Sequence, residues 1–588
     1  MKSILRILLL LLPTLSLVGQ QREYPLPERP AKNVILLISD GTSLPTVSLA
    51  RWYQRALDPQ AQHLALDPYL SGSVITYCSN APIGDSAPTT SCYMTGVPSI
   101  DGFIATYPYS EPHNDLVPLD SSWAYRPVVT LLEAAKQTQG KRIGVVCTCE
   151  FPHATPADCT AHSSSRKLYK SIVPQMVDNG VDLLLGGGTS LMTSELKERL
   201  NRQGIALYLD DLAAMRAHRG GGMWALFGEM DMPYDMDRRS LGDTLRYPSL
   251  AEMTETAIRN LENPNGFVLM VEGSKVDWAA HANDPVAMAT EFLAFDKAVA
   301  VALDYAQRDG NTIVLVTADH GNSGMSIGRV DRGYARLTLD ELIMPLTRFR
   351  YSSVELGRKT SQTALSHLAD SLYIWSGIRP SDEELAEINA VEDYACSTLS
   401  AEQRKTKYAA LGWSQKYRLK EYFVDWMKRH LLIGFTTHGH TGEEVFLASY
   451  TPQQLTPIRG CVTNIDLHNY MRTQLGLEQT MLELSEEYYA PHDALFPQAQ
   501  CEITGDQPEE KRITIHYQGH EIELRAYQRR AWVDGVEQEL PTPVVYVSET
   551  NKFYLSRSLV RSPISSRVIS GQPMPKKQRS TSASRSPS

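Results

Sequence analysis

Residues 292–320 read FLAFDKAVAVALDYAQRDGNTIVLVTADH and contain the structural unit that repeats along this chain. Apolar residues recur at helical spacing from Phe292 to Leu303, so the first half predicts an amphipathic helix. The polar RDGN segment interrupts that pattern, and IVLVT is a continuous apolar run typical of sheet strands buried on both faces. The unit is therefore a helix, a turn and a buried strand, and the strand leads directly into Asp319 and His320.

Other segments repeat this unit or its strand half. Residues 128–150 and 250–273 each predict a helix, a break and a strand, whereas residues 33–40 (NVILLISD) and 181–188 predict buried strands alone. Repeated helix–strand units predict an α/β fold in which helices flank a large, mostly parallel central sheet.

Acidic groups follow several of the predicted strands. In open α/β sheets, functional sites gather at the carboxyl ends of the strands. A single acidic strand end is an ordinary turn, but several of them with histidines nearby indicate a metal site. The residues concerned are Asp40, Asp85, Glu272, Asp277, Asp319 and His320.

Residue spacing adds further candidate ligands. Asp277 and His281 are four residues apart, so on a helix they lie on one face and can share a metal ion. The segment TTHGHTGEEV (436–445) supplies His438 and His440. Mixed oxygen and imidazole ligands suit Zn²⁺, whereas Mg²⁺ prefers oxygen ligands alone. A set of the second kind is Asp40, Thr155 and Glu272.

The segment GDSAPTTSCYMTG (84–96) has two interpretations. It can be an ordinary helix N-terminus, with Pro88 in the first turn. Alternatively, Ser86 is a nucleophile aimed at an anion, which the start of a helix would favour. A serine hydroxyl is a poor nucleophile at neutral pH, so the second interpretation requires metal coordination or a base.

Bulk composition limits the class of protein. The length of 588 residues suggests one large domain with appendages, and the net charge of −10 gives no reason to expect nucleic-acid binding. Residues 1–20 predict a signal peptide, hence a periplasmic or extracellular protein, and we expect no transmembrane segment. Eight cysteines allow up to four disulfides, whose pairing the sequence does not give.

The chain divides into segments of different character. Residues 30–477 predict the main domain, in which residues 329–432 are a helical insert that forms a lid, a dimer contact or surface decoration. We expect a linker at 478–511, a small β domain at 512–560 and a disordered basic tail at 561–588. The small domain resembles the N-terminal β module of copper amine oxidases.

Six separated motifs occur in the order found in alkaline phosphatases, and the chain resembles that family from about Lys32 to about Leu477. The motifs are LLISDGTS, GDSAPTTSCYMTG, HATPADCTAHSSSR, VEGSKVDWAAH, VTADHGNSG and HTGEEV. The resemblance implies a homodimeric hydrolase of small phosphate monoesters. It also implies a phosphoserine intermediate and a site for two zinc ions and one magnesium ion.

The resemblance implies roles for individual residues as well. The ligands of the first zinc would be Asp277, His281 and His440. Those of the second would be Asp40, Asp319, His320 and the Ser86 oxygen. Asp40 would also bridge to a magnesium ion completed by Thr155 and Glu272.

The remaining implied roles concern the phosphate. Ser86 would be the nucleophile, and Arg166 would hold two phosphate oxygens, which the planar guanidinium matches. His153 would lie beside the magnesium ligands. Trp278 occupies a position that other members fill with Lys or His, so we expect it to tune affinity. His440 is preferred to His438 as a ligand because it immediately precedes Thr-Gly, as in the motif.

Two other functions fit parts of the sequence. A phosphodiesterase or sulfatase of the same superfamily would share the zinc ligands, although the Cys-x-Pro-x-Arg signature of sulfatases is absent. A non-catalytic secreted scaffold would use the core and the β module to bind a partner. That hypothesis predicts missing metal ligands, and none of the expected ligands is missing.

Overall fold

The computed structural model describes residues 22–561 apart from short internal gaps, which are 330–332, 335–336, 392–393, 395–399, 401, 404–405 and 407–417. The expected signal peptide, the tail beyond Arg561 and Cys396 lie outside the described residues. The chain forms two compact units, Met1–Ser485 and Glu486–Ser588.

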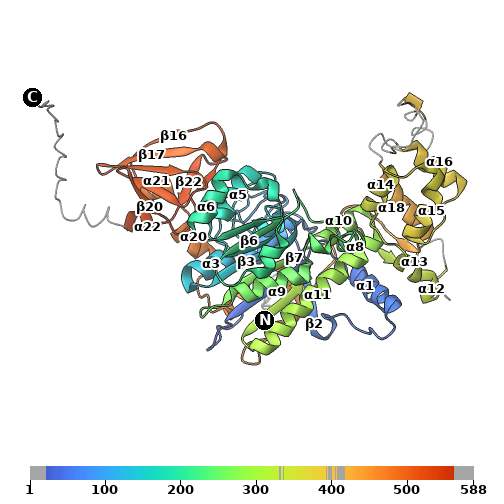
Figure 1. Cartoon of the computed structure of the whole chain (residues 1–588). Coiled ribbons are helices and arrows are strands. Elements are labelled where there is room, and N and C mark those ends of the chain that lie inside the picture. The colour runs from blue at the N-terminus through green and yellow to red at the C-terminus, as the bar shows by residue number, and fades with distance from the viewer. Residues whose placement is uncertain are drawn as a thin grey trace, which may run out of the picture. The chain divides into compact units, whose positions relative to one another are not determined.

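The first unit is built on a ten-stranded sheet that helices flank (Figure 1). Seven of its neighbouring strand pairs are parallel, and only β13 runs antiparallel to its neighbours, β2 and β8. The predicted mostly parallel α/β fold is therefore confirmed. In sheet order the strands are β14 (Gly460–Thr463), β2 (Leu70–Ile75), β13 (Val445–Tyr450), β8 (Thr312–Thr317), β1 (Asn33–Ser39), β7 (Phe267–Gly273), β3 (Arg142–Glu150), β4 (Leu183–Gly187), β6 (Met223–Phe227) and β5 (Ala206–Leu209).

The central strands are buried because helices cover both faces of the sheet. Every residue of β1, β7 and β8 is buried, which explains their continuous apolar sequences. The helices α1 (Leu44–Leu57) and α9 (Leu250–Leu261) each pack against α11 (Pro285–Asp309). A second group packs around α2, and its members are α2 (Ser86–Thr95), α3 (Leu131–Gln139) and α19 (Asn464–Gln474).

Strand register brings the acidic strand ends to one edge of the sheet. Ile38 of β1 pairs with Glu272 of β7 on one side and with Thr317 of β8 on the other. Asp40 and Asp319 each follow by two residues, so they leave the sheet at the same level. The candidate ligands of three adjacent strands therefore meet where the carboxyl ends of parallel strands form sites.

The insert is helical where the structure describes it. Its helices are α12 (Leu339–Leu342), α13 (Met344–Thr347), α14 (Ser353–Ser361), α15 (Leu365–Ser376), α16 (Asp382–Ala390) and α18 (Leu419–His430). The capping box predicted at Ser381 and Glu384 is present at the start of α16. Leu356, Phe423 and Trp426 share one hydrophobic cluster with residues of α11, so this part of the insert is packed onto the core.

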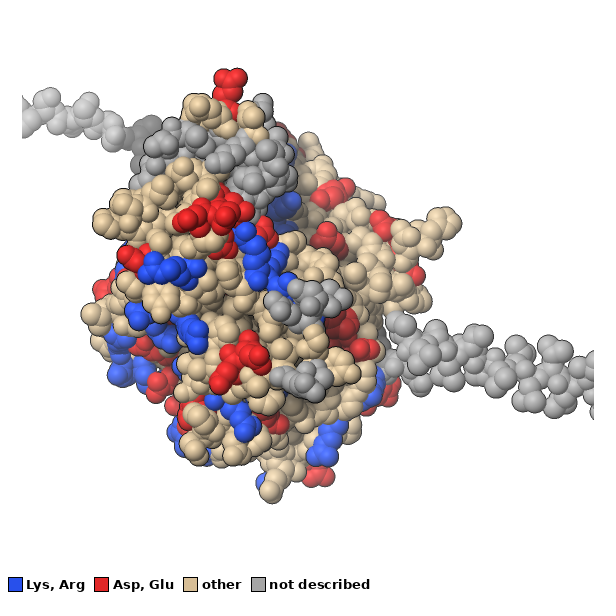
Figure 2. Space-filling model, turned by 90° about the vertical axis from the view of Figure 1, so that its right-hand side faces the viewer, with Lys and Arg blue, Asp and Glu red and all other residues tan. Residues whose placement is uncertain are grey.

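The face of this unit that carries the insert shows Lys and Arg interspersed with Asp and Glu (Figure 2). No large patch of a single sign is visible on it. Within the described residues, no helix is long and apolar enough to cross a membrane.

The second unit contains a five-stranded antiparallel sheet. Its strands, in order, are β16 (Gln500–Thr504), β17 (Arg512–Tyr517), β18 (His520–Arg525), β19 (Arg530–Val533) and β20 (Val536–Glu539). The turns at Gln518-Gly519 and Asp534-Gly535 have positive φ at both residues, as two-residue hairpins require.

Residues 478–511, which we expected to be a linker, are folded over much of their length. They contain α20 (Met481–Tyr488), β15 (Ala490–Pro491), α21 (His492–Leu495) and β16. The small sheet thus begins before residue 512. Its first strand, β16 (QCEIT), was not predicted, because it is polar and mostly exposed. It lies at the edge of the sheet and pairs only with β17.

The cysteines show no disulfide among the residues described. All seven described cysteines are free, and five of them are buried: Cys78, Cys92, Cys147, Cys149 and Cys159.

Candidate metal centre

Ser86 opens helix α2 and faces the ends of two central strands. Its side chain is buried, with 2% of the residue exposed. The Oγ atom lies 3.5 Å from Oδ1 of Asp40 and 3.4 Å from Nε2 of His320. Residues that lie far apart in the sequence therefore meet around one hydroxyl.

Four carboxylates are buried beside Ser86. Among the described residues, Asp40 Oδ2, Glu272 Oε1 and Asp319 Oδ2 are buried oxygens without a hydrogen-bond partner. Asp277 is 5% exposed, and its Oδ1 accepts a 2.7 Å hydrogen bond from Asn322. Because ionised carboxylates are costly to bury without a partner, this cluster requires a positive charge.

The pKa shifts of the cluster also indicate that it needs a positive charge. Burial, together with Asp319 and Asp277, raises the pKa of Asp40 well above its ordinary value. Burial also raises the pKa of Glu272 to about 8. Burial opposes a charge on His320, but Asp319 and Asp277 outweigh it and raise the pKa of this imidazole. In the absence of a cation, the cluster therefore retains protons.

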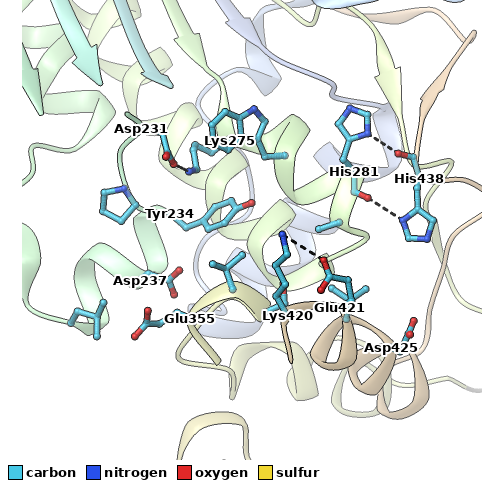
Figure 3. A pocket seen from close by; sticks show the side chains of 17 residues that line it. Asp231, Tyr234, Asp237, Lys275, His281, Glu355, Lys420, Glu421, Asp425 and His438 are labelled. Carbon is cyan, nitrogen blue, oxygen red and sulfur yellow. Dashed lines mark hydrogen bonds and ion pairs between the residues drawn. The ribbon is translucent and has the colours of Figure 1, made fainter. Parts of the chain in front are cut away.

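Three imidazoles are oriented by backbone carbonyls. His320 donates from Nδ1 to Gly321 O at 3.1 Å, and His440 donates from Nδ1 to Gly84 O at 2.9 Å. His281 donates from Nδ1 to His438 O at 2.6 Å (Figure 3). A carbonyl only accepts, so each Nδ1 carries a proton, and in the neutral ring each Nε2 has a lone pair for a metal ion. This is the second hydrogen bond that metal-binding histidines characteristically make.

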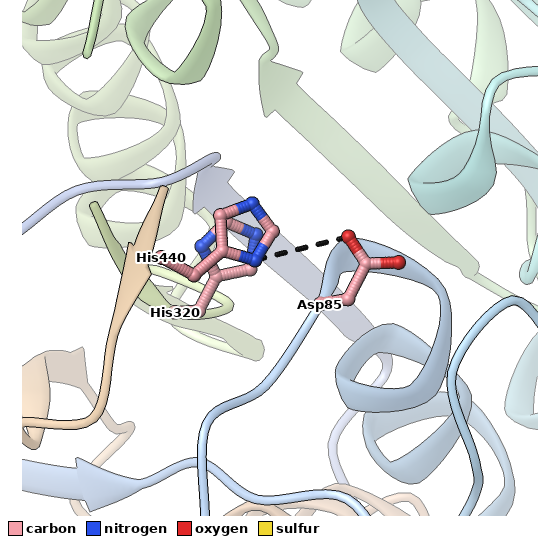
Figure 4. A group of neighbouring side chains, drawn as sticks. All are labelled: Asp85, His320 and His440. Carbon is pink, nitrogen blue, oxygen red and sulfur yellow. Dashed lines mark ion pairs between the residues drawn. The ribbon is translucent and has the colours of Figure 1, made fainter. Parts of the chain in front are cut away.

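The free Nε2 atoms point at the carboxylates and at one another. His281 Nε2 lies 3.2 Å from His440 Nε2 and 3.5 Å from Asp277 Oδ2. The His320 and His440 rings stack at 3.7 Å between centroids, with Asp85 beside them (Figure 4).

Among the described residues, potential ligand atoms lie within 4.8 Å of one another in five groups of three. Three groups consist of predicted site residues: Asp277, His281 and His440; Asp40, Asp277 and His320; and Asp40, His153 and Glu272. The other two are Asp85, His320 and His440, and Cys147, Cys149 and Glu272.

Arg166 is held beside the nucleophile. It donates from one guanidinium nitrogen to both oxygens of Asp85, at 2.9 and 2.7 Å, and from the other to His153 Nε2 at 3.1 Å. Burial alone would raise the pKa of Asp85, but Arg166 outweighs it and holds that pKa well below its usual range. Asp85 is the N-cap of α2, but its side chain accepts no capping hydrogen bond and instead accepts two from Arg166.

The other predicted residues lie around this core. Thr155 is fully buried in the short helix α4 (Ala154–Ala157), which packs against β3 and β7, and its hydroxyl lies 3.5 Å from that of Thr90. The Trp278 ring makes an edge contact with the ring of His153, at 6.0 Å between centroids. Of these residues, His153 also contacts Arg166.

Sequence reasoning missed parts of the site. The sequence places Asp85 among the acidic strand ends that indicate a metal site, but it does not reveal the ion pair by which Asp85 orients Arg166. Asn322 holds Asp277, and the Cys149 thiol lies 3.6 Å from Glu272 Oε2. Asn322 reaches the site through the pairing of β9 (Gly321–Asn322) with β12 (His440–Thr441), which two-residue strands do not reveal in a sequence.

Comparison with known proteins places this chain in a family. The sequence model of the alkaline phosphatase family matches residues 31–477. Alkaline phosphatase 3 of Bacillus subtilis is 31% identical over 453 residues, which are 74% of this chain and 87% of that protein. Alkaline phosphatase of Escherichia coli is 29% identical over 363 residues, covering 51% and 72% of the two chains.

A solved structure supports the fold. The alkaline phosphatase of Thermus thermophilus superposes with a TM-score of 0.64 at 24% identity. The match covers 81% of this chain and 99% of that one. The mostly parallel sheet with helices on its faces is thus an architecture seen in solved structures.

Proposed function

This chain belongs to the alkaline phosphatase family, and we propose that it cleaves phosphate monoesters through a phosphoserine formed on Ser86. Phosphomonoester hydrolysis follows from the family itself. The serine intermediate and a site for two zinc ions and one magnesium ion form the specific part of the proposal.

The orientation of the ligand atoms is the observation that carries the proposal. Three Nε2 atoms and three unpartnered buried carboxylate oxygens belong to one cluster of side chains, and the Ser86 hydroxyl contacts two members of it, Asp40 and His320. Such a donor set fits divalent ions, and nitrogen donors suit zinc.

The residues divide among the ions as follows. Asp277, His281 and His440 would hold one zinc. Asp40, Asp319, His320 and the Ser86 oxygen would hold the other. Asp40, Thr155 and Glu272 would hold magnesium, with His153 beside them.

The protein's own groups position both chemical steps. When bound, zinc would supply Lewis acidity that lowers the pKa of a coordinated hydroxyl or water and stabilises the leaving alkoxide. Ser86 Oγ forms a bond to phosphorus as the ester oxygen departs, and water then displaces Oγ to release phosphate. Arg166 donates to two phosphoryl oxygens throughout, and Asp85 and His153 keep its planar fork in place.

We also infer that the protein is exported and forms a homodimer. Export rests on the charged and apolar pattern of residues 1–20. The homodimer rests on the family resemblance. Light scattering of the mature protein would report a mass of two chains if the second inference holds, and of one chain if it does not.

A trapping experiment tests the phosphoserine. The enzyme is mixed with a ³²P-labelled aryl monoester and quenched in acid, and the labelled peptide is sequenced. We expect the label on Ser86, and we expect Ser91→Ala to keep it, because Ser91 bonds instead to Asp158. Label on another residue, or rapid turnover without label, would overturn the proposed intermediate.

A substrate comparison separates the proposal from a diesterase. We expect phenyl phosphate to be hydrolysed far faster than diphenyl phosphate. The reverse order would favour the phosphodiesterase alternative, and hydrolysis of neither ester would favour a non-catalytic scaffold.

A further inference from the structure

The buried hydroxyl of Ser43 connects three segments that lie far apart in the sequence. Its Oγ atom donates to Glu443 Oε1 at 2.5 Å and accepts a 3.1 Å hydrogen bond from the backbone N–H of Asn322. It also lies 3.2 Å from the carbonyl oxygen of Asn322. A hydroxyl has only one proton to donate, and the carboxylate offers the shorter, charge-assisted bond.

Each of these three segments carries a candidate metal ligand two or three residues before the residue that makes the connection. The ligand and the connecting residue on each segment are Asp40 and Ser43, His320 and Asn322, and His440 and Glu443. The first two ligands are those expected for one zinc ion, and the third is expected for the other. Because so few residues separate each ligand from the connection, the hydroxyl limits how far the ligands can move relative to one another.

Asn322 extends the connection to a fourth ligand, Asp277. Its Nδ2 donates to Asp277 Oδ1 at 2.7 Å, and its Oδ1 accepts a 2.6 Å hydrogen bond from the N–H of Ser323. Both ends of the amide are therefore engaged, while Ser43 holds its backbone. The second oxygen of Asp277, Oδ2, lies 3.5 Å from His281 Nε2, the other ligand expected for the first zinc ion.

The local structure favours this connection over a more usual role for the serine. Ser43 is the N-cap of α1, where a serine side chain commonly accepts a hydrogen bond from the first turn, but it makes no capping hydrogen bond. Gly321 leaves room for the carboxylate, since a Cβ atom there would lie 2.5 Å from Glu443 Oε1. The Ser43 hydroxyl is thus used between segments rather than within its own helix.

We propose that Ser43 and Glu443 are positioning residues, whose hydrogen bond holds the ligand-bearing segments at the spacing that zinc binding requires. The inference rests on the proposed function and adds to it two residues to which no metal ion is assigned. Hydrogen-bond partners behind metal ligands typically change metal affinity or activity by about 10- to 100-fold when they are removed. Ser43 acts on Asp277 through Asn322, so we expect an effect at the lower end of this range.

Zinc titration of the metal-free protein tests the inference. Metal is removed from the full-length protein, and Zn²⁺ is returned in the presence of a competing chelator, so that affinity is measured without reference to activity. Ser43→Ala should weaken zinc binding by about tenfold. Glu443→Ala should weaken it to a similar extent, and it provides a second test at an exposed position.

Two further variants separate the hydrogen bond of Glu443 from its charge. Glu443→Gln keeps an acceptor for the Ser43 hydroxyl but removes the charge, so it should retain most of the zinc affinity. Glu444→Ala removes the same charge from the neighbouring exposed position and should bind zinc as the wild type does.

Ser485→Ala is the matched control for Ser43→Ala. Ser485 is also fully buried, and its hydroxyl likewise donates to one acceptor and accepts from the backbone N–H of a distant segment. It lies on α20, outside the candidate site. Loss of this hydroxyl should lower stability but leave zinc affinity unchanged.

The outcomes separate the two proposals. If the wild-type protein binds no zinc, the proposed metal centre itself fails. If the wild type binds zinc but Ser43→Ala has the same affinity as Ser485→Ala, the inference fails alone. It also fails if Glu443→Gln loses as much affinity as Glu443→Ala, since charge rather than the hydrogen bond would then account for the effect.

Discussion

At the scale of single residues, the neighbours Asp85 and Ser86 have different roles: Ser86 is the proposed nucleophile, and Asp85 orients Arg166. Ser86 Oγ turns toward Asp40 and His320, whereas the Asp85 carboxylate turns toward Arg166. The nucleophile and the arginine that would hold the phosphoryl oxygens are thus positioned from one helix N-terminus. Their relative placement depends on a single peptide unit.

Ser86→Ala should abolish turnover, because no hydroxyl remains to form the covalent intermediate. Binding of inorganic phosphate should persist, since Arg166 and the metal ligands are unchanged. Phosphate release from an aryl monoester and calorimetric titration with phosphate measure the two effects. Undiminished turnover in this variant would contradict the role given to Ser86.

Arg166→Lys should lower kcat/KM at least about tenfold, because an ammonium cannot reproduce the planar fork. The fork donates to both Asp85 and His153, so the substitution also frees these two residues. Inhibition by phosphate should weaken in parallel. Steady-state kinetics with and without phosphate provide the measurement, and a lysine variant with wild-type values would show that Arg166 does not hold the phosphoryl group.

The residues of the site were predicted unevenly from sequence. Asp40, Glu272 and Asp319 could be placed together because strand ends in a parallel sheet meet at one edge. His440 could be selected only through the family motif, because it reaches the site by way of the insert and the β9–β12 pair. The ion pair of Asp85 with Arg166 depends on a loop conformation that no periodicity in the sequence encodes.

At the scale of elements, the junction between β1 and α1 determines how closely helix α10 (Lys275–Ala282) approaches the sheet. Gly41 has a φ of +60°. A Cβ atom there would lie 2.3 Å from Asp277 Oδ1, well inside contact distance. A glycine is therefore required both for the backbone conformation and for the space that Asp277 occupies.

Gly41→Ala should displace Asp277 and weaken zinc binding. It should also lower stability by roughly 1–2 kcal/mol, the ordinary cost of a left-handed non-glycine residue. Gly310→Ala is the matched control, because Gly310 has a φ of +70° but nothing within 4 Å of the added atom. Zinc titration and thermal unfolding distinguish the variants. Equal zinc affinity in both would contradict the account of this junction.

Among the elements, long periodic segments were predictable and short ones were not. The helix–strand unit at 292–320 corresponds to the C-terminal part of α11 followed by β8. By contrast, β16 was mistaken for linker because its residues are polar and exposed. A short edge strand is stabilised by hydrogen bonds to its neighbour, and these leave no hydrophobic pattern in the sequence.

At the scale of the whole molecule, the buried carboxylates couple metal binding to folding. Without a cation, Asp40 and Glu272 retain protons in the folded protein to higher pH than in the unfolded chain. A bound ion would balance the carboxylate charge in place of these protons, and it would stabilise the folded state by mass action. Stability should therefore depend on metal and on pH together.

Chelation should lower the melting temperature, and the loss should be larger at pH 8 than at pH 6.5. The pKa of Glu272 is raised from 4.5 to about 8, so the folded metal-free protein binds more protons than the unfolded chain in this interval. Its stability consequently falls as pH rises, by up to about 1.4 kcal/mol per pH unit for each such group. Histidines with lowered pKa values, such as His440, oppose this trend only near pH 6.5, where the imidazoles of the unfolded chain are still partly protonated.

Calorimetric scans of metal-loaded and chelated protein at the two pH values measure this effect. The loaded protein should show the flatter pH dependence. Identical melting temperatures for loaded and chelated protein at both pH values would mean that the carboxylate cluster binds no stabilising ion.

The most direct test of the divalent cluster is metal analysis of the purified protein, with phosphate release measured on the same sample before and after chelation. The account predicts two zinc ions and one magnesium ion per chain, loss of phosphate release when they are removed, and recovery when Zn²⁺ and Mg²⁺ are returned together. Full phosphate release from protein that contains only trace divalent metal would contradict it.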